Sequence, residues 1–507
     1  MPHPDPSGPF ARRLAGILLH PTSLPGAGAC GELGAEAFRF VDFLADAGIG
    51  VWQMLPLGPT HADRSPYQCT SVHAGNPRLI SLQGLRECGW LEDTAEPAAD
   101  PATDERARAD RLRAAFAGFQ RRGDAQAQAA FAAFRQTHGW WLNDFALYEA
   151  LRREQQQRGW FHWPHDLRDR LPEALDAARH RLAAAIDQVC FDQFVFFRQW
   201  HALRAYANAR GVRLFGDVPI FVAYDSADVW ACRDCFRLDA EGRMEVVAGV
   251  PPDYFSATGQ RWGNPHYRWD VLEADGFRWW IERMRTQREL FDLIRIDHFR
   301  GFEAHWEIPA TAETAIDGRW VEAPGERLFR ALQDSLADLP LVAEDLGIIT
   351  PEVDALRQRF GLPGMKILQF AFGGDAGNPY LPHNHDRLSV VYTGTHDNDT
   401  TLGWYAHLAE DARGHLHAYL GHPAEALPWP LIRAALASVA VLAVVPWQDA
   451  LALGSEHRMN TPGVAEGNWR WRFDWGQVPE GLAARLRGLV TLYGRVPEDA
   501  SDTSGVS

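Results

Sequence analysis

Acidic side chains follow four short apolar runs of this 507-residue sequence, at the point where each run ends. They are Asp217 in "FGDVP", Asp297 in "RIDHFRG", Glu344 and Asp345 in "AEDLG", and Asp397 and Asp399 in "THDND". A buried charge costs free energy unless it is paired or takes part in chemistry. Two carboxyl groups about 5–5.5 Å apart, one ionised and one protonated, can break a glycosidic bond with retention of configuration. Retaining glycosidic chemistry is therefore the first hypothesis that these residues support.

The neighbours of two of these carboxyl groups predict different pKa values. Arg295 and Asp297 are two residues apart on a predicted strand, so both point to the same face, and the guanidinium should lower the pKa of Asp297. Glu344 follows the apolar "LPLVA" beside other negative charges, and both effects raise a carboxyl pKa. These features predict Asp297 as the nucleophile and Glu344 as the acid/base. Asp397, flanked by His396, would hold sugar hydroxyls and stabilise a positively charged transition state.

Eight short, nearly continuous apolar runs are the elements that would position these residues. They lie at 15–20, 50–58, 211–219, 291–297, 339–345, 365–372, 388–397 and 439–449. Such runs favour parallel strands buried on both faces, although the last could equally continue a helix. Helical patterns lie between many of them, at 34–48, 190–211, 275–291 and 351–361. The alternation predicts an α/β fold, a (β/α)8 TIM barrel, with a doubly wound open sheet as the alternative.

The chain is expected to form one catalytic barrel domain over residues 1–507, since no long low-complexity linker divides it. Residues 60–185 predict a mostly helical insertion beside the barrel mouth. Residues 222–275 are dense in glycine, proline and aromatics, which is typical of a functional loop. The tail, 497–507, is expected to be disordered.

Composition narrows the class of protein. A formal net charge of −16 without a basic stripe argues against nucleic-acid binding. The sequence shows neither a signal peptide nor a bilayer-spanning run, so no membrane contact and a cytoplasmic location are expected. All six cysteines are expected to be reduced thiols. Cys232 and Cys235 form a lone CxxC, a weak signal for zinc or redox chemistry.

Seven motifs together closely resemble the 4-α-glucanotransferases of the amylomaltase, or disproportionating enzyme, type. They are "SPYQ", "GDVPIFVAYDSADVW", "PPDYFSATGQRWGNP", "RIDHFRG", "AEDLG", "GTHDNDT" and "RMNTPG…NWRWR". The resemblance extends from about Leu14 to the 480s. It implies a retaining enzyme with a (β/α)8 barrel, related to the α-amylase clan. The enzyme would transfer a segment of an α-1,4-glucan to the 4-hydroxyl of another sugar through a covalent glucosyl-enzyme intermediate.

The same resemblance implies roles for individual residues. It gives Asp297, Glu344 and Asp397 the three catalytic roles already inferred from their surroundings. Contacts around the cleaved sugar would come from Tyr67, Asp217, Arg295 and His396. A loop over the glucan chain would carry Tyr254, Phe255, Gln260 and Trp262, with Gly259 and Gly263 as hinges. Maltooligosaccharides, amylose or other α-1,4-glucans would be donor and acceptor, with no cofactor, no metal and no appended starch-binding module.

Three other functions remain open from the residues alone. A hydrolase of the same clan would use identical carboxylates, because water and a sugar hydroxyl attack the same intermediate. A metal-dependent barrel enzyme could use Asp297, His298, His396 and Asp399, although "DND" lacks the later glycine and glutamate of an EF-hand loop. A non-catalytic glycan-binding protein would explain the twenty tryptophans but not the opposed carboxylates.

Overall fold

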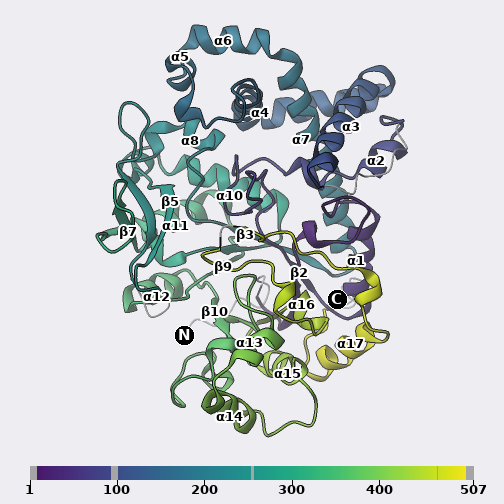
Figure 1. Ribbon diagram of the computed structural model, residues 1–507, viewed down its shortest axis with the longest axis vertical. Helices are drawn as coiled ribbons and strands as arrows, with labels where there is room; N and C mark the ends of the chain where they lie inside the picture. Colours follow the sequence, from purple (N-terminus) through teal and green to yellow (C-terminus); the bar gives the residue numbers. More distant parts are fainter. Residues whose placement is uncertain (1–7, 9, 93–100, 253–255, 465, 498–507) are drawn as a thin grey trace, which may run out of the picture.

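A computed structural model describes residues 8, 10–92, 101–252, 256–464 and 466–497 (Figure 1). Tyr254 and Phe255, predicted to lie in the loop over the glucan, fall outside the described residues. So does all of the predicted tail except its first residue, Pro497.

Eight parallel strands form the central sheet, in the order β10-β11-β12-β1-β2-β3-β6-β9. They are β1 (Leu14–Leu18), β2 (Val51–Gln53), β3 (Arg213–Val218), β6 (Leu293–Ile296), β9 (Leu341–Ala343), β10 (Gly364–Ile367), β11 (Ser389–Tyr392) and β12 (Leu442–Pro446). The two ends of this order meet, since the Ala343 N–H donates to the Pro363 carbonyl at 2.9 Å. The predicted (β/α)8 barrel is therefore confirmed, and each of the eight apolar runs overlaps one strand.

The barrel interior is filled by alternate side chains of the strands, as the two-residue period of a strand requires. Leu293 of β6, Val390 and Tyr392 of β11, and Leu442 and Val444 of β12 belong to this interior cluster. The same alternation from Leu293 brings the next inward position of β6 to residue 295, which is an arginine.

Helices surround the barrel, and Figure 1 shows them between and outside the strands. Those flanking the barrel are α1 (Ala35–Asp46), α7 (Ala183–Asn208), α10 (Arg278–Leu290), α11 (Gly325–Leu336), α12 (Pro351–Arg359), α13 (Thr401–His407), α14 (Glu410–Tyr419), α15 (Trp429–Ala437), α16 (Trp447–Ala450) and α17 (Leu482–Leu492). In α11 the buried Leu328, Phe329, Leu332 and Leu336 recur at three- and four-residue spacing, which gives the helix one apolar face.

A helical layer lies above the barrel in Figure 1. Its members are α2 (Leu82–Glu87), α3 (Pro101–Arg122), α4 (Ala125–Glu154), α5 (His165–Arg168), α6 (Pro172–Arg181) and α8 (Ala227–Ala231). Aromatic side chains join α4 to α7, since Phe134 packs 5.9 Å from Phe194 and 5.6 Å from Phe197 between ring centroids. Many tryptophans and phenylalanines of the chain thus serve helix packing.

A second, antiparallel sheet of four strands was not predicted from the sequence. Its order is β5-β4-β7-β8, formed by β4 (Val246–Val250), β5 (Gln260–Pro265), β7 (Ala304–Pro309) and β8 (Arg319–Glu322). The sheet lies at the left of Figure 1. In the chain, the short helix α9 (Trp269–Ala274) comes directly after β5. Because β7 begins seven residues after Asp297, this sheet is attached directly to the barrel mouth.

The prediction that all six cysteines are reduced is wrong for one pair. Cys232 directly follows α8 and Cys235 lies in the next turn of 3₁₀ helix, and a disulfide joins them. The turn brings their Cα atoms to 5.6 Å, within the usual range for a disulfide. Cys30, Cys69, Cys88 and Cys190 are free thiols. In the described ranges, no helix combines the length and apolar character that crossing a bilayer requires.

Candidate active site

The four predicted carboxylates lie at the same end of the barrel. Asp217 is the second-to-last residue of β3. Asp297, Glu344 and Asp397 follow β6, β9 and β11. Backbone hydrogen bonds continue the sheet to two of them: Asp297 N–H donates to Val218 O at 2.9 Å and Glu344 N–H to Ile296 O at 3.0 Å. The strands therefore fix where these side chains begin, as in a barrel whose C-terminal strand ends carry the chemistry.

Arg295 joins two of the carboxylates from inside the barrel. Its Nη1 donates to both oxygens of Asp217, at 2.6 and 2.8 Å, and its Nη2 donates to Asp297 Oδ1 at 2.8 Å. Only 5% of Arg295 and 1% of Asp217 is exposed. Each buried charge is thus compensated by its partner, and the fork of the guanidinium fixes the orientation of Asp297.

We expect Arg295→Met to lower the free energy of unfolding by about 3–5 kcal/mol, because Asp217 would stay buried without a partner charge. The double variant Arg295→Met/Asp217→Asn should recover part of that loss, since the uncompensated charge is then removed. Urea unfolding at pH 7 measures both. If the double variant is no more stable than the single one, the ion pair is not what stabilises the base of the site.

Glu344 is held by backbone groups rather than by a cation. Its Oε2 accepts the His298 N–H at 2.6 Å and its Oε1 accepts the Leu346 N–H at 2.9 Å. His298 adopts a left-handed backbone with φ 51°, an uncommon conformation for a residue with a side chain. With this conformation the chain turns directly after Asp297, and the His298 N–H points toward Glu344.

The pKa of Asp297 shifts in the opposite direction from the sequence prediction. Burial at the barrel mouth raises the pKa of Asp297 and outweighs the lowering by Arg295. Burial also raises the pKa of Glu344, to about 7. Asp297 still ionises first, because it accepts a hydrogen bond from Arg295 and keeps 29% of its side chain exposed to solvent. The pairing of an ionised Asp297 with a protonated Glu344 stays a prediction, and this geometry is compatible with it.

Tyr67 and His396 form one wall beside Asp217. The Tyr67 hydroxyl donates to Asp217 Oδ2 at 2.6 Å and lies 2.9 Å from His396 Nε2. The two rings stack with centroids 5.3 Å apart, and the Trp469 ring lies 6.0 Å from each. All four residues predicted to surround the cleaved sugar, Tyr67, Asp217, Arg295 and His396, thus belong to one hydrogen-bonded network with Asp297.

Asp397 is the most open of the predicted catalytic carboxylates, with 47% of its side chain exposed. Asn460 Nδ2 donates to its Oδ1 at 2.7 Å, and His396 Nε2 lies 3.3 Å from the same oxygen. Arg458 Nη2 donates to the Asp397 backbone carbonyl at 2.9 Å. Sequence reasoning missed Arg458, Asn460 and Trp469 as site residues, although "RMN" and "NWRWR" contain them, because they follow no strand of the barrel.

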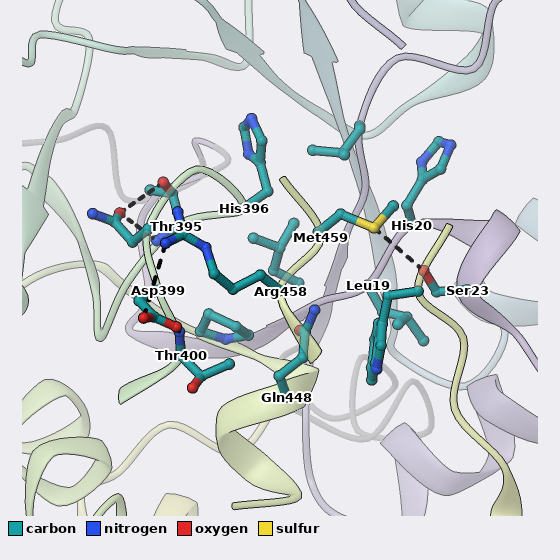
Figure 2. A pocket seen from close by; sticks show the side chains of 15 residues that line it. Leu19, His20, Ser23, Thr395, His396, Asp399, Thr400, Gln448, Arg458 and Met459 are labelled. Carbon is teal, nitrogen blue, oxygen red and sulfur yellow. Dashed lines mark hydrogen bonds and ion pairs between the residues drawn. The ribbon is translucent and has the colours of Figure 1, made fainter. Parts of the chain in front are cut away.

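A small cavity extends from His396 toward the first strand. Figure 2 shows Thr395, Asp399 and Arg458 on one side of it and Leu19, His20, Ser23 and Met459 on the other. Arg458 lies 3.9 Å from Asp399, and Ser23 donates to the Met459 sulfur. The cavity offers polar groups next to Asp397, where a sugar hydroxyl could be held.

The strand β5 brings two predicted glucan contacts to the mouth. The Trp262 ring lies edge-on to His298 with centroids 4.9 Å apart, and Trp262 Nε1 donates to Gln260 Oε1 at 3.1 Å. Gly259 and Gly263 have φ of 66° and 79°, conformations that suit glycine. Trp262 therefore contacts the Asp297–His298 turn directly, and Gln260 is connected to that turn through Trp262.

Within the part of the chain that the structure describes, no three His, Cys, Asp or Glu side chains are arranged as metal ligands. The mouth has two carboxyl groups with different partners: a partly exposed Asp297 on a guanidinium and a buried Glu344 on backbone N–H groups. This arrangement suits nucleophilic attack by one carboxylate and proton transfer by the other carboxyl group.

Comparisons with known proteins agree with this chemistry. The profile of the family described as 4-alpha-glucanotransferase matches residues 19–477. The chain is 54% identical over 497 residues to the 4-alpha-glucanotransferase of Thermus thermophilus, covering 96% of this chain and 99% of that protein. It is 50% identical over 496 residues to that of Synechocystis, covering 96% and 98%. Among solved structures, amylomaltase from Streptococcus agalactiae in complex with acarbose superposes with a TM-score of 0.92 at 36% identity, covering 96% of this chain and 100% of that one.

Proposed function

The chain belongs to the 4-alpha-glucanotransferase family, and from that premise we propose that Asp297, Glu344 and Asp397 perform the transfer. The observation that carries this proposal is that Asp297 and Glu344 have different hydrogen-bond partners. Asp297 is bound by a guanidinium that favours its ionised form, whereas Glu344 accepts hydrogen bonds from two backbone N–H groups and has no cation in hydrogen-bonding contact. One group can then attack while the other holds a proton.

In the first step, Asp297 attacks the anomeric carbon of the donor glucan and forms a covalent ester with it. Glu344 gives its proton to the glycosidic oxygen, and the released chain leaves with a free 4-hydroxyl. In the second step, the Glu344 carboxylate removes the proton from the 4-hydroxyl of an acceptor sugar. That oxygen attacks the anomeric carbon, the bond to Asp297 breaks, and the configuration is retained.

Asp397 would oppose the positive charge that develops on the sugar ring in both transition states. Asn460 and His396 keep its carboxylate oriented. Tyr67 and Asp217 would contact the cleaved sugar beside them. Gln260 and Trp262, with Tyr254 and Phe255, would contact the glucan chain.

As substrates we propose maltooligosaccharides, amylose or other α-1,4-glucans, both as donor and as acceptor. The solved amylomaltase of Streptococcus agalactiae is in complex with acarbose, and this supports a sugar-like ligand for the present chain. We also propose that residues 1–507 act as a single catalytic unit, with 60–185 and 222–275 as insertions around the mouth. The cytoplasm is the proposed location, supported by four free thiols and opposed by the Cys232–Cys235 disulfide.

Incubation of the purified protein with maltotriose alone tests the reaction. We expect early glucose together with maltopentaose and longer chains, without a matching rise in total reducing ends. A rise in reducing ends that matches the loss of bonds would instead indicate hydrolysis, with the same carboxylates but without an acceptor site.

The pH dependence of kcat/KM should report the two carboxyl groups. Only protonated Glu344 can act as the acid, so above its raised pKa of about 7 the rate should fall about tenfold per pH unit. On the acid side the rate should fall as Asp297 takes up a proton. Initial rates with maltotriose from pH 4 to pH 10 measure both limbs. An alkaline limb that persists unchanged in Glu344→Gln would assign it to another group.

A further inference from the structure

A pocket rich in arginine lies beside the catalytic mouth, lined by residues of the turn before Tyr67, of the helix α3 and of the segment that carries Trp469. Its charged lining groups are four arginines and two carboxylates: Arg64, Arg78, Arg108, Arg470, Asp104 and Glu105. His20 and Met459 line both this pocket and the cavity in Figure 2, so the two adjoin each other. We call it the arginine pocket. None of its arginines takes part in the chemistry described above.

Two of the four arginines have carboxylate partners. Arg78 Nε donates to Glu105 at 3.0 Å, and Arg108 forms an ion pair with Glu32. The other carboxylate of the lining, Asp104, accepts a backbone N–H at 2.9 Å. This leaves two guanidinium groups and one carboxylate, and therefore a local excess of positive charge in a chain whose formal net charge is −16.

The remaining two arginines, Arg64 and Arg470, have no hydrogen-bond or ion-pair partner for their guanidinium groups among the described residues. Both can reach a ligand, since Arg470 is exposed and Arg64 is partly exposed. Burial lowers the pKa of Arg64, and the positive charges of Arg78 and Arg470 lower it further. Guanidinium groups thus repel one another in this pocket, and a bound anion would relieve that repulsion.

Left-handed backbone conformations position both unpaired arginines. Arg64 has φ 65°, and Trp469, which directly precedes Arg470, has φ 62°. Hydrogen bonds fix both places, because the Arg64 N–H donates to His61 O at 3.1 Å and the Trp469 N–H donates to Met459 O at 2.8 Å. Such conformations are uncommon for residues with side chains, and they cluster at ligand sites. The backbone therefore determines that the two charges meet in one pocket.

A phosphate group matches these features. Guanidinium groups bind phosphate oxygens through paired N–H donors, and a phosphate ester carries close to two negative charges at pH 7, one for each unpaired arginine. Trp469 also lines the pocket and is partly exposed, with its ring 6.0 Å from the rings of Tyr67 and His396. A sugar attached to the phosphate could therefore place its C–H face on an aromatic ring.

We propose that the arginine pocket binds a phosphate group between Arg64 and Arg470, either as free phosphate or as the phosphate ester of a sugar. Charge would select this ligand, in contrast to the neutral glucans proposed for the mouth. The proposal does not depend on the transfer reaction, because none of Asp297, Glu344 and Asp397 lines the pocket.

Isothermal titration calorimetry without any glucan tests this proposal. We expect inorganic phosphate at pH 7.5 in 50 mM NaCl to bind with a Kd of about 1 mM or lower, as for two charge-assisted contacts. Arg64→Gln and Arg470→Gln should each raise that Kd about tenfold or more. Glucose 6-phosphate is titrated in parallel. A lower Kd than that of inorganic phosphate would identify a sugar phosphate as the ligand, and an equal Kd would identify free phosphate.

Arg39→Gln is the matched control, because Arg39 is an exposed arginine of α1 that lies over another tryptophan ring, Trp475, at 4.1 Å from its centroid. The Kd should stay within about twofold of the wild type in this variant. An equal loss in Arg39→Gln and Arg64→Gln overturns the proposal, since binding would then follow the overall charge. Absence of binding to the wild type overturns it, as does an unchanged Kd in both Arg64→Gln and Arg470→Gln. Failure of the transfer reaction would leave all these titrations unaffected.

Discussion

Asp297→Asn should reduce turnover of maltotriose by about 10⁴-fold or more, because an amide cannot form the covalent ester with the anomeric carbon. The fold should survive the change. An asparagine oxygen at this position can still accept the hydrogen bond from Arg295, and the guanidinium keeps its two contacts to Asp217. Initial rates, together with thermal unfolding of the same preparation, measure the two effects separately.

Asp292→Asn is the matched control, since Asp292 precedes β6 whereas Asp297 follows it. Asp292 accepts hydrogen bonds from Arg204, Asn208 and the Leu214 N–H at the N-terminal end of the barrel. Its loss should lower stability and leave the rate per folded molecule close to the wild type. Near-normal turnover in Asp297→Asn would remove this residue from the mechanism.

The barrel itself was predictable from the sequence because its strands are buried on both faces. The run 291–297 contains β6 and the run 388–397 contains β11, each nearly continuous in apolar residues. The two-residue period of a strand also gave the shared face of Arg295 and Asp297, which the hydrogen bond between them bears out. The local sequence pattern was therefore sufficient for features that a single strand determines, such as its position in the chain and which side chains share a face.

The second sheet was not predictable for the opposite reason. Its strand β5 reads "QRWGNP" and β8 reads "RWVE", so neither has an apolar run or a clear alternation. These strands exist because partners elsewhere in the chain pair with them; β4, for example, pairs with β7 some 60 residues further on, as Val246 faces Pro309. One partner of Asp397 has the same origin, since Asn460 lies 63 residues away in the chain.

The direction of the Asp297 pKa shift shows a further limit of sequence reasoning. The neighbouring guanidinium was visible in "RID", but the extent of burial depends on how all eight strand ends and their loops close around the site. Burial proved the larger effect. Residue types and spacing thus identified the groups and their partners, while the balance between desolvation and charge required the assembled barrel.

Glu344→Gln should lower turnover of maltotriose by about 10³–10⁴-fold, because glutamine cannot protonate the departing glycosidic oxygen. A donor whose leaving group needs no proton should restore the first step. With α-maltosyl fluoride we expect a rapid release of fluoride and accumulation of the maltosyl-enzyme ester on Asp297, since the acceptor hydroxyl then lacks its base. Mass spectrometry of the quenched protein detects the ester. Asp297→Asn should show no rapid release of fluoride and no ester.

The contrast between these two variants assigns the roles separately. Asp345→Asn is the control for Glu344→Gln, because Asp345 is its sequence neighbour but accepts the Met365 N–H at 2.6 Å and lies 3.3 Å from Arg357, away from the dyad. It should keep activity on both donors. Azide, which attacks without a base, should release the trapped ester from Glu344→Gln. Equal losses on maltotriose and on the fluoride in that variant would show that Glu344 shapes the site rather than transferring the proton.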